Sequence, residues 1–384
     1  MNNTVGNERN SQIDAMRGIA IIMMVYGYTF GTFREWVYLF HMPVLFMISG
    51  FLFDEKHITS KENAYKYWFG KLRRLIVPYM ICNLIVMLLN NIWVSIGFLN
   101  NSEEFLNATA NAVNPQRGFG KFGIYTAIVN VYKILLLRYI PQLASPTWFL
   151  TVLFGVISVN CLATFWMARI SGKKIRVYLF STVFLLMLLL SWYITLNMPE
   201  ISNTFELRHL RIIPAYVAFM MGVAVSAVHK RTHSHTVYMI LGIVGLVILF
   251  IILSHGGHIE LSRCEIYNPI VYVLCSLSGW FILFYCSYLL NKVKAGTILT
   301  YIGKHTMAIL FLHMICFRTV SFIYVLYKGL PKYMIASSPV IFSTSELTKI
   351  IYTIVGVVVP IAMYQIWRLI QNKVKGAVKG ISLQ

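Results

Sequence analysis

Apolar residues in this chain are gathered into long runs that short polar stretches separate. A helix needs about 20 apolar residues to cross a bilayer, and windows of that length predict ten transmembrane helices. They cover residues 14–33, 36–53, 75–97, 147–168, 177–197, 209–228, 237–254, 269–290, 298–326 and 348–370. The pattern therefore predicts an all-α polytopic membrane protein with one integral-membrane domain over residues 1–384.

The polar segments predict how the chain is oriented in the membrane. Residues 1–12 form a polar tail, residues 371–384 a basic tail, and residues 99–146 the main polar interruption. Because Lys and Arg recur in every second loop and near both ends, we expect both termini in the cytoplasm. Residues 120–140 are only moderately apolar, which predicts an interfacial amphipathic helix in an external loop. If that segment spans the membrane instead, every later loop changes side.

Composition supports the membrane class and excludes nucleic-acid binding. The chain is 58% hydrophobic and only 12% charged, whereas soluble domains are nearer half apolar. The net charge is +20, but the basic residues follow the positive-inside rule and form no groove interleaved with aromatic residues. The histidines lack carboxylate or cysteine partners at ligand spacing, so we expect no metal site. The sequence sets no oligomeric state.

Two polar side chains share one face of the first predicted span. Arg17 and Tyr28 are eleven residues apart, which is about three helical turns and about 16 Å along the axis. Ionisable groups at membrane depth are costly unless they are paired or face a wet cavity, so they indicate a functional site. Arg34 and Glu35 follow at the external turn, where they either bind sugar hydroxyls or are simply solvated.

His41 stands in the second predicted span, two residues before Pro43. Proline removes one helical hydrogen bond and frees the carbonyl of Leu39, which predicts a polar niche inside the membrane. In that niche His41 either acts as a base or only hydrogen-bonds the carbonyl.

Three further groups of polar residues are candidates for binding a ligand. Lys71, Arg73 and Arg74 lie in a loop expected in the cytoplasm. They either bind phosphate groups of a ligand or only set the orientation of the chain in the membrane. Arg208 and Arg211 share a helical face at the outer end of the sixth predicted span. They either bind an acidic ligand or only extend their charged groups to the membrane surface by snorkelling. His313 lies about mid-depth in the ninth predicted span, as a site residue or a packed histidine. We assign Glu35, Arg34, Arg208, Arg211 and His313 to acceptor binding.

Several motifs in sequence order resemble the membrane-bound acyltransferase type-three family, and in particular its fucose 4-O-acetylase-like branch. The opening resembles RIDxxRGxxIxxVxxGH followed by FHMPxFFxISGFLF, as the residues at 13–27 and 40–53 show. Further matches are KLRRLIVPY at 71–79, PTWFL at 146–150 and IGKHTMAILFLH at 302–313. The resemblance covers nearly the whole chain.

The resemblance implies an enzyme of the bacterial inner membrane that moves acetyl from cytoplasmic acetyl-CoA. The acceptor it implies is a hydroxyl of a cell-envelope glycan or lipid-linked sugar. We assign donor binding to Arg17, Lys71, Arg73 and Arg74. In our hypothesis His41 deprotonates the acceptor hydroxyl, and Tyr28 donates a hydrogen bond to the thioester oxygen as negative charge develops.

Tyr28 departs from the family pattern, which places a histidine eleven residues after the arginine of the first span. A free phenol has a pKa near 10 and a free imidazole near 6.5, so a phenol is a poor base at neutral pH. Three interpretations follow: His41 is the base, Tyr28 is activated by a nearby cation, or the protein is weakly active or inactive. An inactive member would still bind CoA or glycan.

A rival from another class is a permease or flippase that uses the same polar interior. Such proteins are expected to show broken helices in paired inverted repeats. The sequence shows no such symmetry.

Overall fold

The protein is almost entirely helical. Its computed structural model describes residues 2–110, 116–167, 169–170, 172–198, 207–231, 234–341 and 344–381. Within these ranges there is no β-strand, and only an isolated bridge joins Glu260 and Glu265. The all-α prediction is therefore confirmed for the described part of the chain.

Seven helical stretches among the described residues are long and apolar enough to cross a membrane. They are η3 with α9 (Gln142–Met167), most of α10 (Lys173–Leu196), α13 (Ile212–His229), α14 (His235–Ser254), α15 (Pro269–Asn291), α17 (Thr306–Lys328) and most of α18 (Glu346–Ile381). Each coincides with one of the last seven predicted spans. The multi-pass class is thus supported, while the count of ten and the side on which the termini lie stay predictions.

The first three predicted spans are helical but interrupted. α1 (Asn2–Gly27) ends before a turn, and residues 36–53 divide into α2 (Arg34–Tyr38) and α3 (His41–Phe51). At 1.5 Å per residue, the eleven residues of α3 rise about 16 Å, roughly half of a 30 Å bilayer. Residues 75–97 belong to a bent series made of α4 (Lys61–Lys71), a π-helical turn η2 (Leu72–Ile76), α5 (Val77–Leu88) and α6 (Asn90–Ser95).

The polar interruption at residues 99–146 contains two short helices and one 3-10 turn. These are α7 (Glu103–Thr109), α8 (Ile124–Leu135) and η3 (Gln142–Thr147). α8 rises only about 18 Å, which is too short to cross a bilayer alone. Its exposed side chains include Ile124, Tyr125 and Ile128, so this helix presents an apolar face away from the bundle, as an interfacial helix does.

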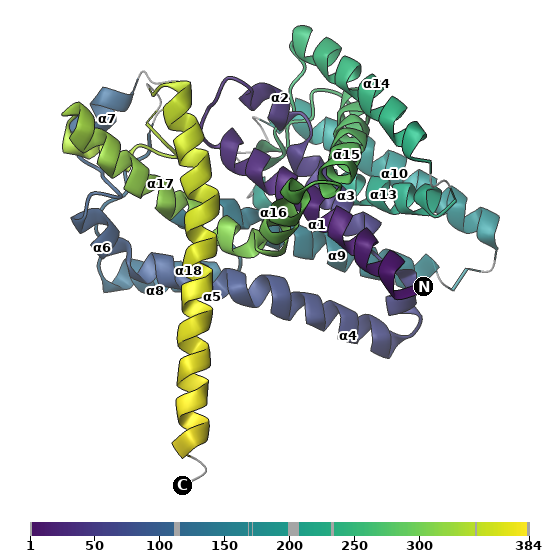
Figure 1. Ribbon diagram of the computed structural model, residues 1–384, viewed down its shortest axis with the longest axis horizontal. Helices are drawn as coiled ribbons and strands as arrows, with labels where there is room; N and C mark the ends of the chain where they lie inside the picture. The colour runs from purple at the N-terminus through teal and green to yellow at the C-terminus, as the bar shows by residue number, and fades with distance from the viewer. Residues whose placement is uncertain are drawn as a thin grey trace.

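The ninth predicted span, residues 298–326, is split at His305 into α16 (Lys294–Lys304) and α17. α16 packs along α1 at a glycine contact between the two backbones (Figure 1). A Cβ built on Gly303 would lie 2.7 Å from the carbonyl carbon of Asp14, and one on Gly18 would lie 2.9 Å from that of Leu299. Only glycine allows helices to approach so closely.

A second glycine contact positions α3 against α13. Cβ atoms added at Gly50 and Gly222 would meet the backbones of Phe219 and Met47 respectively. α3 is therefore held in the largest buried cluster, which also includes Phe46, Phe219 and Trp280. The short helix that begins at His41 is fixed by packing on both sides.

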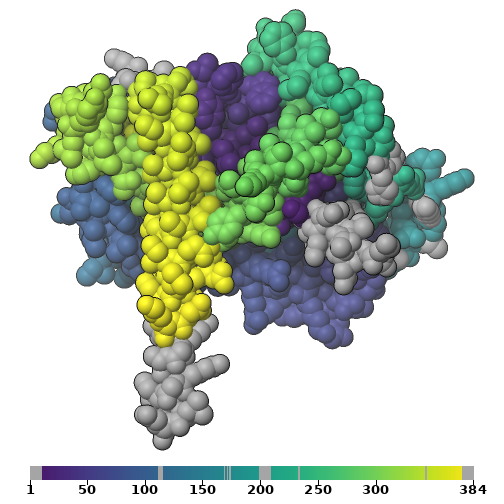
Figure 2. Space-filling model, in the orientation of Figure 1, coloured from purple at the N-terminus to yellow at the C-terminus, as the bar shows by residue number. Residues whose placement is uncertain are grey.

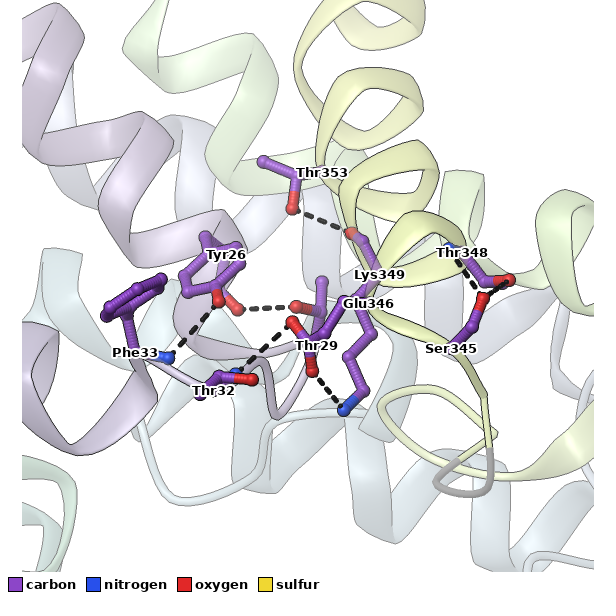
Figure 3. A network of polar contacts seen from close by, with 9 residues as sticks. All are labelled: Tyr26, Thr29, Thr32, Phe33, Ser345, Glu346, Thr348, Lys349 and Thr353. Carbon is purple, nitrogen blue, oxygen red and sulfur yellow. Dashed lines mark hydrogen bonds and ion pairs between the residues drawn. The ribbon is translucent and has the colours of Figure 1, made fainter.

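α18 runs along the outside of the bundle beside α17 (Figures 1 and 2). Its first turn is tied to the turn after α1: the Thr32 amide donates to Glu346 at 3.3 Å, and Lys349 pairs with the same carboxylate at 2.8 Å (Figure 3). Tyr26 joins this network because its hydroxyl accepts from the Phe33 amide at 3.3 Å. The remaining short helices are η1 (Glu55–Ile58), α12 (Leu207–Leu210), η4 (Leu261–Arg263) and η5 (Lys332–Ala336).

Candidate active site

A cavity of about 270 Å³ lies among α1, α3, η2, α9 and α17. Its lining combines basic side chains, apolar side chains and the two aromatic residues Tyr28 and Trp148. The basic residues are Arg17, Lys71 and Arg74, and the apolar ones include Met24, Met42, Leu45, Ile48, Leu153 and Leu310. We call this cavity the channel.

One stripe of α1 runs along the channel. Arg17, Ile21, Met24 and Tyr28 all line it, at spacings of four, three and four residues that keep them on one helical face. Tyr28 lies just beyond the last helical residue, where its amide still donates to the carbonyl of Met24 at 3.3 Å. The eleven-residue spacing therefore brings Arg17 and Tyr28 to one cavity, about 16 Å apart along the axis.

The basic part of the channel combines side chains from three elements, α1, α4 and η2. Arg17 forms an ion pair with Asp14 at 3.1 Å, one helical turn away, and its side chain remains 34% exposed. Lys71 and Arg74 approach from the end of α4 and from the π turn η2. Three basic groups against one carboxylate make this part of the channel suitable for an anion.

Arg73 does not line the channel. Its guanidinium stacks on the ring of Phe69 at 4.6 Å. Neighbouring arginines at 73 and 74 point to different surroundings, and η2 is the π-helical turn that carries both of them. Such turns are frequent at functional sites.

Tyr28 is surrounded by aromatic and polar groups. Its ring lies 5.5 Å from the ring of His313, centroid to centroid, and the side chain of Trp148 is a hydrogen-bonding neighbour of its hydroxyl. Arg211 stacks on Trp148 at 5.0 Å. Tyr28 thus lies next to the aromatic rings of Trp148 and His313, and the guanidinium of Arg211 packs against the Trp148 ring.

His313 is the more completely buried of the two candidate histidines. Its side chain is fully enclosed, and Nδ1 lies 2.7 Å from the carbonyl oxygen of Ile309. If Nδ1 carries the proton that this bond requires, Nε2 is the basic nitrogen. Nε2 has no hydrogen-bond partner among the described residues. Leu310, one turn earlier on α17, lines the channel.

His41 is the first residue of α3 and is 4% exposed. Its Nδ1 lies 2.8 Å from the carbonyl oxygen of Val37. The sequence predicted the carbonyl of Leu39 as the partner, and that prediction is wrong. The bonded carbonyl is the one four residues earlier, the same arrangement that His313 makes with Ile309 within α17. His41 itself does not line the channel, but the next residue, Met42, does.

Arg34 and Glu35 pair with each other beyond the channel. Arg34 also stacks on the rings of Phe30 and Tyr38, at 4.6 and 4.2 Å. The Tyr38 ring lies 4.9 Å from that of His41, so Arg34 is connected to His41 through one aromatic side chain. The side chain of Arg208 lies outside the described residues.

Sequence reasoning missed two residues of this region. Trp148 lines the channel, and the PTWFL motif was the signal that could have identified it. Glu260, from the loop after α14, is an electrostatic neighbour of both Tyr28 and Arg34. No local pattern marks Glu260, because its approach depends on the packing of a distant loop.

No group of three or more His, Cys, Asp or Glu side chains in the described part of the chain could hold a metal ion. The channel is a mainly apolar cavity that three cations also line, with the Tyr28 phenol in its lining and the His313 imidazole packed against that phenol. Such a cavity fits a ligand that has an anionic head and a thin apolar arm.

A family model described as an acyltransferase domain matches residues 10–365. The matched region includes every residue that lines the channel. No curated protein and no solved structure was found to match the chain.

Proposed function

Since this chain belongs to the type-three acyltransferase family, we propose that it transfers an acyl group, acetyl by preference, from acyl-CoA to a hydroxyl group. The acceptor we propose is a cell-envelope glycan or a lipid-linked sugar, as in the fucose 4-O-acetylase-like branch. The single observation that carries the proposal is the stripe of α1 that places Arg17 and Tyr28 along one channel.

The channel fits an acyl-CoA donor in both charge and shape. Arg17, Lys71 and Arg74 would bind phosphate oxygens, because guanidinium and ammonium groups make strong charge-assisted hydrogen bonds to them. The pantetheine arm would then lie along Met24, Leu45 and Leu310, with the thioester near Tyr28. A volume of about 270 Å³ leaves space for a short acyl group beyond the arm, which favours acetyl.

In the reaction we propose, the acceptor hydroxyl enters beside Met42, the residue next to His41 that lines the channel, and His41 takes its proton through Nε2. The resulting oxygen attacks the thioester carbonyl, and Tyr28 donates a hydrogen bond to the carbonyl oxygen as it becomes negative. When the tetrahedral intermediate collapses, the C–S bond breaks and the CoA thiolate takes the proton back from His41. The new C–O bond leaves the acyl group on the acceptor.

We place the protein in the bacterial inner membrane as a multi-pass protein, with the Arg17 end and both termini at the cytoplasmic face. The basic residues in every second loop and near both chain ends support this orientation. The supply of acyl-CoA in the cytoplasm supports it as well. The lipid bilayer is then the partner of the exposed apolar faces, such as those of α8 and α14.

A pseudoenzyme that binds CoA without turnover is the second candidate function, and Tyr28 is the observation that favours it. A phenol at the position of the family histidine has a pKa about 3.5 units higher in free solution, so its basic form is scarce at neutral pH. Each unit corresponds to about 1.4 kcal/mol, so a direct exchange of roles would slow the reaction severely.

The test uses purified protein in liposomes, labelled acetyl-CoA and extracted envelope glycans. Wild type should transfer label, Arg17→Gln should lose CoA affinity by about tenfold or more, and Arg73→Gln, outside the channel, should behave as wild type. His41→Ala should lose transfer while retaining CoA binding. Binding without any transfer would identify the pseudoenzyme, whereas glycan flux that needs no CoA would identify a permease.

A further inference from the structure

Two further hollows continue from the Arg17 end of the channel. The first has a volume of about 430 Å³ and shares Arg17 and Leu52 with the channel. The second has a volume of about 260 Å³ and shares Ser11, Thr300 and Lys304 with the first. Neighbouring spaces thus share lining residues, and together the three extend from the channel past Arg17 to α16.

The outer part of this path differs from the channel in its chemistry. We call it the vestibule, and it is lined by Ser11, Asn291, Thr297, Thr300, Tyr301 and Lys304. These side chains offer hydroxyl groups, one amide and one ammonium group, whereas most channel residues beyond the basic part are apolar.

Lys304 is the cation of the vestibule. Its side chain is exposed and forms no ion pair with any described residue. The nearest acidic residue that lines the path, Asp14, is already paired with Arg17. The vestibule therefore has an unneutralised positive charge in addition to the three cations of the channel, one of which, Arg17, lines the hollow between the two spaces.

The vestibule is also a rigid structure. Lys304 follows Gly303, which packs against the backbone of Asp14 at the contact between α1 and α16. Thr300 donates to the carbonyl oxygen of Ser11 at 3.2 Å, and the two side-chain hydroxyls lie 3.2 Å apart. A ligand in this space meets groups that are already held in place, which reduces the entropy cost of binding.

We propose that the vestibule binds the 3′-phosphoadenosine end of the acyl-CoA donor, with Lys304 paired to the 3′-phosphate. This inference rests on the proposed function, because it assigns a subsite to the donor proposed above. Arg17, Lys71 and Arg74 then hold the diphosphate, which lies between the adenosine and the pantetheine arm. The order of chemistry along the path matches the order along CoA: polar head, phosphates, thin apolar arm and thioester.

The test compares the dissociation constants of three compounds: CoA, 3′-dephospho-CoA and pantetheine. Titration calorimetry on the purified full-length protein measures binding whether or not the protein turns over a thioester. Lys304→Ala should weaken CoA binding by roughly five- to tenfold, between the values expected for an exposed ion pair and a buried charged hydrogen bond. The same change should leave 3′-dephospho-CoA and pantetheine binding as in wild type.

Lys294 provides a matched control, because it is an exposed lysine on the same helix that does not line the vestibule. Lys294→Ala should bind all three compounds as wild type does, and Lys304→Arg should retain most of the preference for CoA. Equal weakening of all three compounds by Lys304→Ala, or no weakening at all, would overturn the subsite. A wild-type protein that binds CoA and 3′-dephospho-CoA equally would overturn the subsite alone, whereas one that binds neither would overturn the proposed function with it.

Discussion

Replacing Gly303 with alanine should separate the two helices that hold the donor path. Gly303 lies on α16 where its Cα faces the backbone of Asp14, and a Cβ there would be 2.7 Å from the carbonyl carbon of Asp14. It would also lie 3.1 Å from the amide nitrogen of Gly18. Backbone atoms of α1 therefore occupy the position of the new methyl group, and no flexible side chain can move aside to receive it.

The size of the effect follows from this distance. Carbon atoms pack best at about 3.5–4.0 Å, and the carbonyl oxygen of Asp14 lies closer still to the new Cβ, so α1 and α16 must separate by at least about 1 Å. Overpacking of this kind costs about 1–3 kcal/mol, against a gain of about 0.5–1 kcal/mol when alanine replaces glycine in a helix. We expect a net loss of stability of about 1–2 kcal/mol and a fall of a few degrees in the unfolding midpoint.

The transfer rate should fall by a larger factor than the folding equilibrium, because α1 carries Arg17 and leads directly into Tyr28. A displacement of about 1 Å between groups that position a substrate can lower a rate by about a hundredfold. The measurements are thermal unfolding in detergent and acetyl transfer in liposomes. Gly70→Ala is the control: Gly70 is also helical, but nothing lies within 4 Å of its added Cβ, so its midpoint should be equal or higher. A Gly303→Ala protein with wild-type midpoint and wild-type rate would refute the close contact.

Three further outcomes are expected. Tyr28→His should retain transfer, because an imidazole N–H can replace the phenol as donor to the thioester oxygen, while Tyr28→Phe, which has no donor, should lower the rate by about 10²–10³; liposome assays of both decide. Arg318 is fully buried and donates to the carbonyls of Ser337 and Pro339. Arg318→Met should therefore destabilise the protein by about 1–3 kcal/mol and expose the segment before α18 to proteolysis. Unchanged protection of that segment from protease would contradict this. Glu346→Gln should shift the unfolding midpoint by only a degree or two, since its contacts to Thr32 and Lys349 are exposed.

The sequence predicted the α1 stripe because helical spacing alone determines it. Arg17 and Tyr28 must share a face whenever the intervening residues are helical, whatever packs around them. Tertiary packing decides which cavity that face meets. The same reasoning predicted the seven apolar stretches that the structure contains, because length and hydrophobicity are local properties.

The interruptions could not be predicted in this way. Residues 36–53 are apolar throughout, yet the chain turns between α2 and α3 because α3 is held against α13 by the contacts of Gly50 and Gly222. His41 nevertheless bonds the carbonyl four residues earlier, that of Val37, as His313 does within α17. The place where a helix is interrupted thus depends on neighbours that are distant in sequence, whereas this local bond does not.

The basic residues at 71, 73 and 74 show a second limit. They are alike in composition, and sequence reasoning assigned all of them to the donor. Only Lys71 and Arg74 line the channel, whereas the Arg73 guanidinium lies over the Phe69 ring. Neighbouring residues of any helical turn point in different directions, and which of them meets the cavity depends on how η2 packs, so the difference between Arg73 and Arg74 required the structure.

The surroundings of Tyr28 argue for a site that retains its chemistry. A buried nitrogen without a hydrogen-bond partner costs about 1–3 kcal/mol, and the Nε2 atom of His313 is such an atom beside the Tyr28 ring. Packing alone does not explain this cost, because an apolar side chain of similar shape would fill the space without it. A hydroxyl group brought into the channel by an acceptor would supply the missing donor. If this is the reason for His313, then His313→Gln should impair transfer in the wild type and much less in Tyr28→His, where a second imidazole faces the same space. Equal impairment in both backgrounds would instead make His313 a packing residue.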